Sequence, residues 1–176
     1  TLGISARRLE RLESVAVQCR ELGATVHTYQ LDVTNKSASV EVASSFVDSA
    51  GGIDIVIANA GVGGEDKVET GDPSHINKIL EINILGATNT VVPFIPHLKK
   101  NKSGYIAIIS SIASFLPIPL HGGYSGSKAA VRYISNTLRE DLSSYNISVT
   151  AVCPGFIRSE MTDGKPFSMP FLMDTD

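Results

Sequence analysis

Apolar residues alternate along the chain between short continuous runs and stripes with helical spacing. The runs predict buried strands over residues 1–5, 25–31, 53–58, 105–110 and 147–153, with 53–58 covered on both faces. The stripes predict helices, the first from a cap at Ser5 to Gly23, the others near 40–50, from Ser74 to about 98 and from Tyr124 to about 145. This alternation is typical of βαβ units and predicts an α/β fold with a doubly wound parallel sheet.

The two ends of the chain do not complete this pattern. Thr1 lies inside an apolar strand-like run, and residues 156–176 predict only loop or short helix. We therefore expect a single domain over residues 1–176 that is truncated at both ends, with 156–176 forming a loop region beside the substrate. Because the true N-terminus is expected to be missing, the absence of a targeting signal carries little information.

Composition narrows the class of partner. Apolar residues make up 43% and charged residues 19% of the chain, and the net charge is −3. This balance favours a soluble protein and points to neither nucleic acid nor an anionic membrane. No apolar run is expected to span a bilayer. Cys19 and Cys153 form no CxxC or Cys/His spacing, so we expect no metal site and a reducing, cytoplasmic location.

The segment Tyr124-Ser125-Gly126-Ser127-Lys128 opens the predicted fourth helix. Tyr124 and Lys128 are four residues apart, which places them on one helix face, one turn from each other. A phenol has a pKa near 10, and an ammonium ~4 Å away at an effective dielectric of ~20 supplies about 4 kcal/mol, enough to bring that pKa to ~7. The pair can therefore exchange protons near neutrality; the alternative is an exposed pair on an ordinary amphipathic helix.

Polar or turn-forming residues also follow each predicted strand. In doubly wound sheets, ligands bind beyond the carboxyl ends of the strands, where these residues are expected to gather. They are Arg7, Asp32, Asn59, Ser111 and Pro154-Gly155.

In this order and at these spacings, the motifs resemble the classical short-chain dehydrogenase/reductase family. The resemblance covers nearly the whole chain, from Ala6 to about Asp176, and rests on Asp32-Val33, Asn59-Ala60-Gly61, Asn83, Ser111, Tyr124-x-x-x-Lys128 and Pro154-Gly155. It implies a Rossmann-like, three-layer α/β/α fold whose first and last strands are missing here. It also implies an oxidoreductase that moves hydride between a nicotinamide cofactor and a carbonyl or secondary alcohol.

The resemblance implies four catalytic positions. Tyr124 would be the general acid/base, and Lys128 would lower the phenol's pKa and hold the nicotinamide ribose. Ser111, rather than Ser110, would orient the substrate carbonyl. Asn83 would hold a water that links Lys128 to solvent, although a mid-helix Asn paired with backbone is the alternative.

The implied cofactor site uses the ends of several strands. Asp32 and Val33 would flank the adenine, and the backbone of Asn59-Ala60-Gly61 would pass close to the ribose. Tyr124 and Lys128 would contact the nicotinamide half. Beyond Pro154-Gly155, Ile157 and Ser159 would meet the carboxamide, although the family more often has Thr where Ser159 stands.

Arg7 bears on the choice of cofactor. In dinucleotide-binding folds, NAD users need an acidic residue at the end of the family's second strand, whereas an Arg there suits a 2′-phosphate. Because the family's first strand is missing here, its second strand corresponds to residues 1–5, and this strand ends Ser5-Ala6-Arg7-Arg8. Two arginines in a helix's first turn also oppose its dipole, which a bound phosphate would explain. We therefore expect NADP(H), with NAD(H) possible if the arginines are only solvated surface residues.

The family's glycine-rich turn is absent from this sequence. Gly61-Val62-Gly63-Gly64 is not that turn, because Asp66 takes the place of the third glycine, and we interpret the segment as a loop beside the substrate mouth. Without the strand before the missing turn, the first two strands should face the other three across an open slot. Unpaired buried backbone is costly, so we expect the 176 residues alone to bind cofactor poorly.

The substrate implied is a small to medium, partly apolar ketone or alcohol. Residues 114–120, Phe156 and the segment 161–173 would line its pocket. Two other interpretations remain: a catalytically silent, cofactor-binding regulatory protein, and an epimerase or dehydratase of the same fold. In this family the helix at 74–98 and the Tyr124 helix commonly pair across subunits, which suggests a homodimer or homotetramer.

Overall fold

The fold consists of strands and helices that alternate as the sequence predicts. A computed structural model describes residues 1–163 and 169–175. Its strands are β1 (Leu2–Ala6), β2 (Val26–Gln30), β3 (Ile55–Ala58), β4 (Gly104–Ile109) and β5 (Ile147–Val152). Its α-helices are α1 (Leu9–Glu21), α2 (Lys36–Ala50), α3 (Ser74–Leu80), α4 (Gly86–Val91), α5 (Ile95–Asn101) and α6 (Gly122–Ser143).

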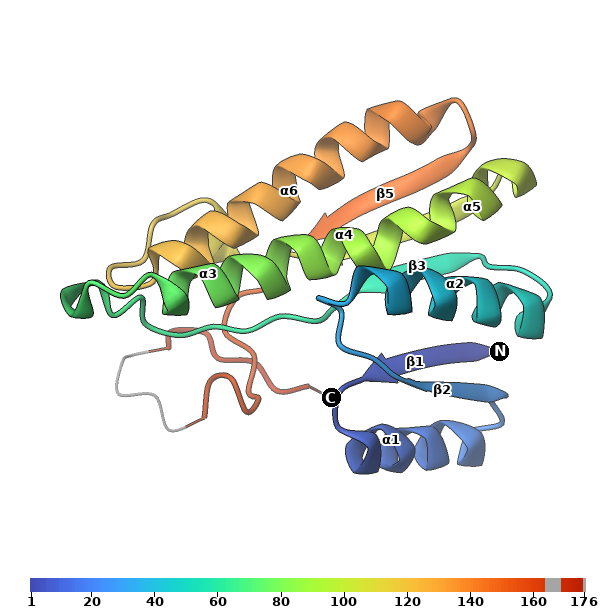
Figure 1. The fold of residues 1–176 in the computed structure, drawn as a ribbon, viewed down its shortest axis with the longest axis horizontal. Helices are drawn as coiled ribbons and strands as arrows, with labels where there is room; N and C mark the ends of the chain where they lie inside the picture. The colour runs from blue at the N-terminus through green and yellow to red at the C-terminus, as the bar shows by residue number, and fades with distance from the viewer. Residues whose placement is uncertain (164–168, 176) are drawn as a thin grey trace.

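The strands form two separate parallel sheets. β1 pairs with β2, starting at Leu2 opposite Val26, and β3, β4 and β5 form a second sheet in that order. Within the described ranges, no hydrogen-bonded ladder joins the two sheets. The expected division of the strands into two and three is therefore confirmed (Figure 1).

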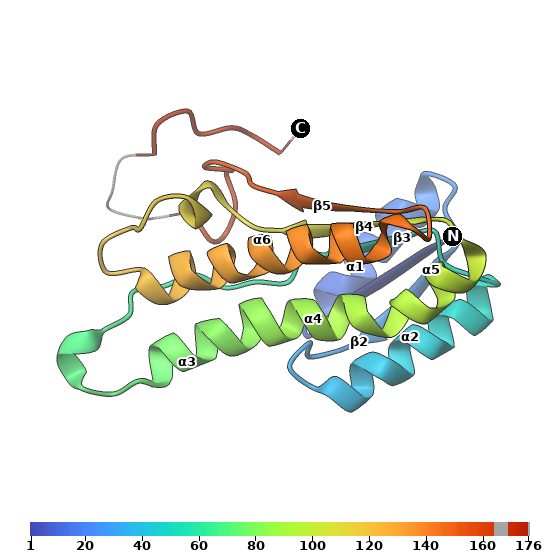
Figure 2. The same cartoon turned by 90° about the horizontal axis from the view of Figure 1, so that it is seen from above.

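The helices form layers on these sheets. Seen from above, α6 and the α3–α4–α5 stretch run side by side over the three-stranded sheet, and α2 lies beside α4 (Figure 2). α1 packs on β1 and β2. One core cluster joins β3, β4 and β5 to α4, α5 and α6, and it contains Val56, Ala58, Ala87, Val91, Leu98, Ile106, Ile108, Val131, Leu142, Ile147 and Val149. Burying such residues is what stabilises this layer.

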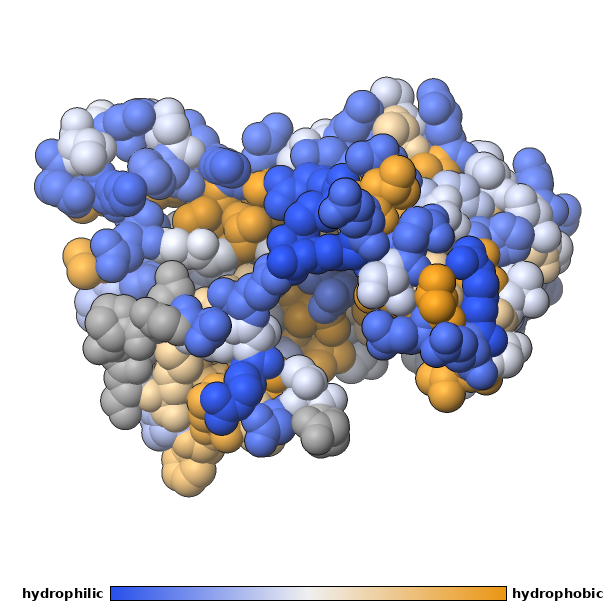
Figure 3. Space-filling view, turned by 90° about the horizontal axis from the view of Figure 1, so that it is seen from below, coloured by the Kyte–Doolittle hydropathy of each residue, from blue (hydrophilic) through white to orange (hydrophobic). Residues whose placement is uncertain are grey.

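The prediction that residues 53–58 are covered on both faces is wrong. Val56 and Ala58 are buried, but Ile55 and Ile57 are 56% and 58% exposed. The reason is that α4 and α6 cover one face of this sheet, whereas α1 packs on β1 and β2. A view from below shows a hollow in which hydrophobic residues are exposed (Figure 3).

The predicted helix over 74–98 is a continuous but irregular helical stretch that extends to Asn101. A π-helical turn, Glu81–Leu85, separates α3 from α4, and a 3-10 turn, Val92–Phe94, separates α4 from α5. The second irregularity coincides with Pro93 and Pro96, which lack the N–H that an α-helix needs. The first one contains Asn83, and it places this residue in the site described below.

The same stretch corrects another expectation. Ser74–Asn101 is long and apolar enough, by length and composition, to cross a membrane, so the statement that no apolar run reaches that length was wrong. The core helices of soluble proteins, which are mostly buried, meet the same criterion, whereas 28% of this apolar window is buried. Here Ala87, Val91 and Leu98 belong to the core cluster over the three-stranded sheet.

Candidate active site

The helix that carries Tyr124 and Lys128 begins at Gly122, two residues before the predicted start. Tyr124 is the third residue of α6, and Lys128 lies one turn further on. Lys128 is 5% exposed, and its Nζ donates to the backbone oxygen of Ile109 at the end of β4 over 2.9 Å. The same Nζ lies 5.8 Å from the centroid of the Tyr124 ring. The structure therefore brings the predicted pair together at the carboxyl end of the sheet.

Burial changes the electrostatics of Lys128. Removal from water disfavours the ammonium and lowers the pKa of Lys128 from 10.5 to about 8. Since this value is still above 7, the side chain stays mostly protonated at neutral pH. Lys128 therefore supplies a positive charge beneath Tyr124 in a setting with little water to screen it.

Asn83 is buried, and its amide is fully engaged with protein groups. Its Oδ1 accepts from the Val62 amide at 2.8 Å, and its Nδ2 donates to the Val62 carbonyl at 2.9 Å and to the Ser127 hydroxyl at 2.9 Å. Ser127 in turn donates to the Tyr124 carbonyl at 2.7 Å. For the side chain of Asn83, these contacts favour the alternative interpretation, in which it pairs with backbone. Sequence analysis missed Ser127; its position one residue before Lys128 was the available signal.

The loop after β3 passes directly over this network. A Cβ placed on Gly61 would lie 3.3 Å from both Asn83 Oδ1 and Lys128 Nζ. The Asn59-Ala60-Gly61 segment, which follows the end of β3 at Ala58, therefore meets the buried lysine through its bare backbone. A side chain at position 61 would press on both of these polar groups, so glycine is favoured here.

The two adjacent serines have different environments. Ser110 is buried and donates to the backbone oxygen of Lys128 at 2.7 Å, so its hydroxyl is used in packing α6 onto β4. Ser111 caps the short 3-10 turn Ile112–Ser114, where its Oγ accepts from the Ala113 amide at 3.1 Å. The Ile112 amide donates to the Pro154 carbonyl at 3.0 Å, which ties this turn to the Pro154-Gly155 segment.

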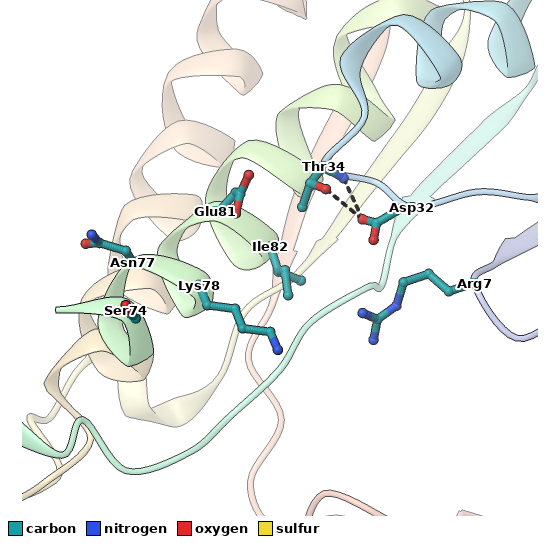
Figure 4. Close-up of a pocket in the computed structure, with 8 residues that line it drawn as sticks. All are labelled: Arg7, Asp32, Thr34, Ser74, Asn77, Lys78, Glu81 and Ile82. Atoms are coloured by element: carbon teal, nitrogen blue, oxygen red, sulfur yellow. Dashed lines mark hydrogen bonds between the residues drawn. The ribbon is translucent and has the colours of Figure 1, made fainter. Parts of the chain in front are cut away.

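A cleft of about 500 Å³ lies at the ends of β1 and β2, near the start of the long helical stretch (Figure 4). Arg7 and Lys78 extend into it from opposite sides. The Asp32 carboxylate accepts from the Thr34 amide and hydroxyl, and these bonds, with the charge of Arg7, hold the pKa of Asp32 below its usual range. The other lining residues are Ser74, Asn77, Glu81 and Ile82. Sequence analysis missed Lys78.

Val33, between Asp32 and Thr34, packs against α4. Its carbonyl accepts from Asn89 Nδ2 at 2.8 Å, and a Cβ on Gly86 would lie 2.5 Å from Val33 Cγ2. Close packing against α4 therefore places the Asp32-Val33 pair.

The contacts of Ile157 and Ser159 that the structure shows stay within the C-terminal segment. Ile157 forms a bridge with Met173, and the Ser159 amide donates to Thr162 Oγ1 at 2.9 Å. Met161 comes closer to Tyr124: a Cβ on Gly63 would lie 3.6 Å from Met161 Sδ and 3.7 Å from Tyr124 Cδ2. Residues 164–168 of the expected substrate segment, 161–173, lie outside the described residues.

Comparison with known proteins agrees with this arrangement. The sequence model of the family described as short chain dehydrogenase matches residues 1–167. The chain belongs to the short-chain dehydrogenase family. This membership confirms the predicted resemblance and the three-layer α/β/α, Rossmann-like fold with strands missing from it, and it makes the protein's family one of oxidoreductases.

Three similar proteins illustrate the range of the family. The chain is 36% identical over 177 residues to 11-beta-hydroxysteroid dehydrogenase A of Arachis hypogaea, covering 99% of this chain and 50% of that protein. It superposes on NAD+-bound xylitol dehydrogenase with a TM-score of 0.85 and 28% identity, covering 89% and 61% of the two chains. For ElxO with NADP bound, the TM-score is 0.82, the identity 28% and the coverage 90% and 64%.

The similar proteins are longer than this chain, and two of them differ in the cofactor that they bind. The chain spans between half and two thirds of the length of these three proteins. The two solved structures hold different nicotinamide cofactors, NAD+ in one and NADP in the other. A nicotinamide cofactor is therefore supported, and the preference between the two is not.

The buried ammonium generates a prediction about stability and pH. Between pH 8 and 10.5 the unfolded chain holds a proton on Lys128 that the folded chain has lost, so stability should rise with pH in this window. Lowering the pKa from 10.5 to about 8 corresponds to roughly 3 kcal/mol, which is the cost present below pH 8. Lys128→Met removes this cost. The variant should be at least as stable as the wild type at pH 7. The difference in free energy of unfolding between the two proteins should narrow toward pH 10.5.

Urea midpoints of both proteins at pH 7, 8, 9 and 10 measure this gap. Lys100→Met, at an exposed lysine of α5, is the matched control and should show no such trend. A Lys128→Met gap that is constant across this pH range would contradict the interpretation.

Proposed function

We propose that the intact protein is an NADP(H)-dependent oxidoreductase that interconverts a carbonyl compound and a secondary alcohol. The observation that carries this proposal is the convergence of Lys128 Nζ, the Asn83 amide and the Gly61 backbone next to Tyr124, at the carboxyl end of the sheet. Such an arrangement holds a cation beneath a phenol where a ligand of a doubly wound sheet binds.

The roles of the residues follow from this geometry and from the family resemblance. When bound, NADP(H) supplies or accepts the hydride. Tyr124 donates a proton to the substrate oxygen during reduction and accepts it during oxidation. Lys128 stabilises the deprotonated phenol by its charge, and Ser111 orients the substrate oxygen through its hydroxyl.

The side chain of Asn83 is proposed to act through Val62 and Ser127. Its amide fixes the loop after β3 to α6, and thereby holds Gly61 against Lys128. Asn59, Ala60, Pro154 and Gly155 shape the cofactor path with their backbone, and Ile157 and Ser159 are proposed to meet the nicotinamide end.

Tyr124→Phe tests the assignment of the acid/base. The substitution removes only the hydroxyl, so turnover of the intact protein should be abolished while the affinity for cofactor stays within about two-fold. NADPH absorbance with a panel of ketones measures turnover, and fluorescence titration measures binding.

Tyr133→Phe is the matched control for this experiment, because Tyr133 lies on the same helix and is 65% exposed. It should leave both quantities unchanged. Substantial turnover by Tyr124→Phe would remove the proposed base.

NADP(H) is the proposed cofactor because the cleft at the ends of β1 and β2 receives two cationic side chains. Arg7 and Lys78 both enter it, and no acidic residue stands at the end of β1 to bind a ribose 2′-hydroxyl. NADP bound to ElxO, which is 28% identical, supports this choice, whereas NAD+ bound to xylitol dehydrogenase keeps NAD(H) as the second candidate.

Arg7→Ala tests this preference in the intact protein. Loss of a charge-assisted contact to phosphate, worth roughly 1.5–3 kcal/mol, should raise KM for NADPH by about ten-fold to a hundred-fold. KM for NADH should change little. Arg20→Ala, at the far end of α1, is the control, and equal effects on NADPH and NADH would argue against a 2′-phosphate contact.

The 176 residues by themselves are proposed to bind cofactor poorly. In the described part of the chain, no ladder of hydrogen bonds joins the β1–β2 sheet to the β3–β4–β5 sheet. The similar proteins are also substantially longer than this chain. Titration of NADPH into residues 1–176 should give an affinity weaker than micromolar. Micromolar binding would contradict this proposal.

The proposed oligomeric state and cellular location rest on the family, on exposed surface and on the cysteines. Leu85 and Val92 of the long helical stretch are at least half exposed, and a groove of about 310 Å³ runs beside Leu80 and Ile84, which supports pairing with a second copy in a homodimer or homotetramer. Cys19 and Cys153 are both unbridged, which suits the cytoplasm.

Substrates are proposed to be small to medium and partly apolar. Phe115, Leu116 and Leu120 are exposed in the loop before α6, and Met161 approaches Tyr124 by way of Gly63. A cofactor-binding protein without turnover, or an epimerase or dehydratase, is the alternative; net oxidation of NADPH by a ketone separates the reductase from both.

A further inference from the structure

Asp66 is a buried carboxylate in the loop between β3 and α3. It is 7% exposed, and both of its oxygens accept hydrogen bonds from the start of α6: Oδ2 from the Gly122 amide at 2.6 Å and Oδ1 from the Gly123 amide at 3.0 Å. Its own amide donates to the Leu120 carbonyl at 2.8 Å. Three hydrogen bonds therefore join one residue to the segment that leads into Tyr124.

The first turn of α6 depends on this distant residue for its cap. The first amides of any α-helix lack partners within the helix, and a side chain at the preceding position usually satisfies them. At α6 that position is His121, whose side chain makes no capping hydrogen bond. A negative group at this end of the helix is also favoured by the helix dipole.

The two glycines make the contact possible. A Cβ on Gly122 would lie 3.0 Å from Asp66 Oδ2, and one on Gly123 would lie 3.0 Å from Oδ1. At Gly123, Ile76 would also lie within 3.3 Å. Larger residues at these two positions would push the carboxylate away from the amides.

We propose that Asp66 is a positioning residue for Tyr124, which rests on the function proposed above. Tyr124 follows Gly123 directly, so the capped turn sets where its ring lies. The loop that carries Asp66 also borders that ring through Gly63. Lys128 is held independently, one turn later, by the Ile109 carbonyl. Loss of Asp66 therefore shifts the phenol relative to the ammonium and leaves the ammonium in place.

The test compares Asp66→Ala, Asp66→Asn and Glu65→Ala in the intact protein. Glu65 is the adjacent, exposed carboxylate and serves as the control. Because small misplacements of a catalytic group cost up to about a hundred-fold in rate, Asp66→Ala should lower kcat by about ten-fold to a hundred-fold. KM for NADPH should stay within about two-fold. Asp66→Asn should recover part of kcat, since its amide oxygen can accept from one of the two amides.

Amide hydrogen exchange gives a readout that does not need turnover. Asp66→Ala should lose protection at Gly122, Gly123 and Tyr124 and keep it from Lys128 onward. Unchanged exchange in this turn, or kcat equal to that of Glu65→Ala, overturns the proposal. If Asp66→Ala does not fold, the same two readouts are taken on Asp66→Asn, with the same criteria.

The two proposals fail in different ways. If the wild-type protein turns over no substrate, the proposed function fails. Exchange in the first turn of α6 then decides the placement of Tyr124 by itself: selective loss of protection supports it, and no loss or loss throughout α6 overturns it.

Discussion

The buried ammonium of Lys128 is the constraint on which the rest of the site depends. Taking this charge out of water is costly, as its lowered pKa indicates, and a hydrogen bond to the Ile109 carbonyl offsets part of the cost. That bond requires β4 to end beneath α6, and the backbone of Gly61 lies close to the ammonium on the other side. A charge placed at such cost next to a phenol suits proton transfer better than it suits folding.

The residues around Lys128 form a chain of contacts that fixes several segments against one another. Asn83 joins the irregular long helix to the loop after β3 and, through Ser127, to α6. Ser110 joins β4 to α6, and the Ile112 amide joins the following turn to Pro154. Asp66 adds a link from the same loop to the start of α6. The candidate site is therefore formed by segments far apart in sequence that meet at the carboxyl end of the sheet.

Much of this could be predicted from the sequence, because it depends on local spacing. The strand and helix order followed from apolar periodicity, and the Tyr124–Lys128 relation followed from the helical repeat. The exposure of Ile55 and Ile57 could not be predicted, because a continuous apolar run does not reveal whether both faces find a partner. The pairing of Asn83 with Val62 and the capping by Asp66 could not be predicted either, since each joins residues 21 or more positions apart by loop geometry.

The account can be tested most directly by a crystal structure of the intact protein with NADP+ and an alcohol substrate. It predicts that the Tyr124 phenol oxygen and the Ser111 hydroxyl both lie about 2.6–3.2 Å from the substrate oxygen. Lys128 Nζ should lie between that phenol and the cofactor's ribose. A substrate oxygen bound to other groups, with Tyr124 turned away from it, would contradict the central claim.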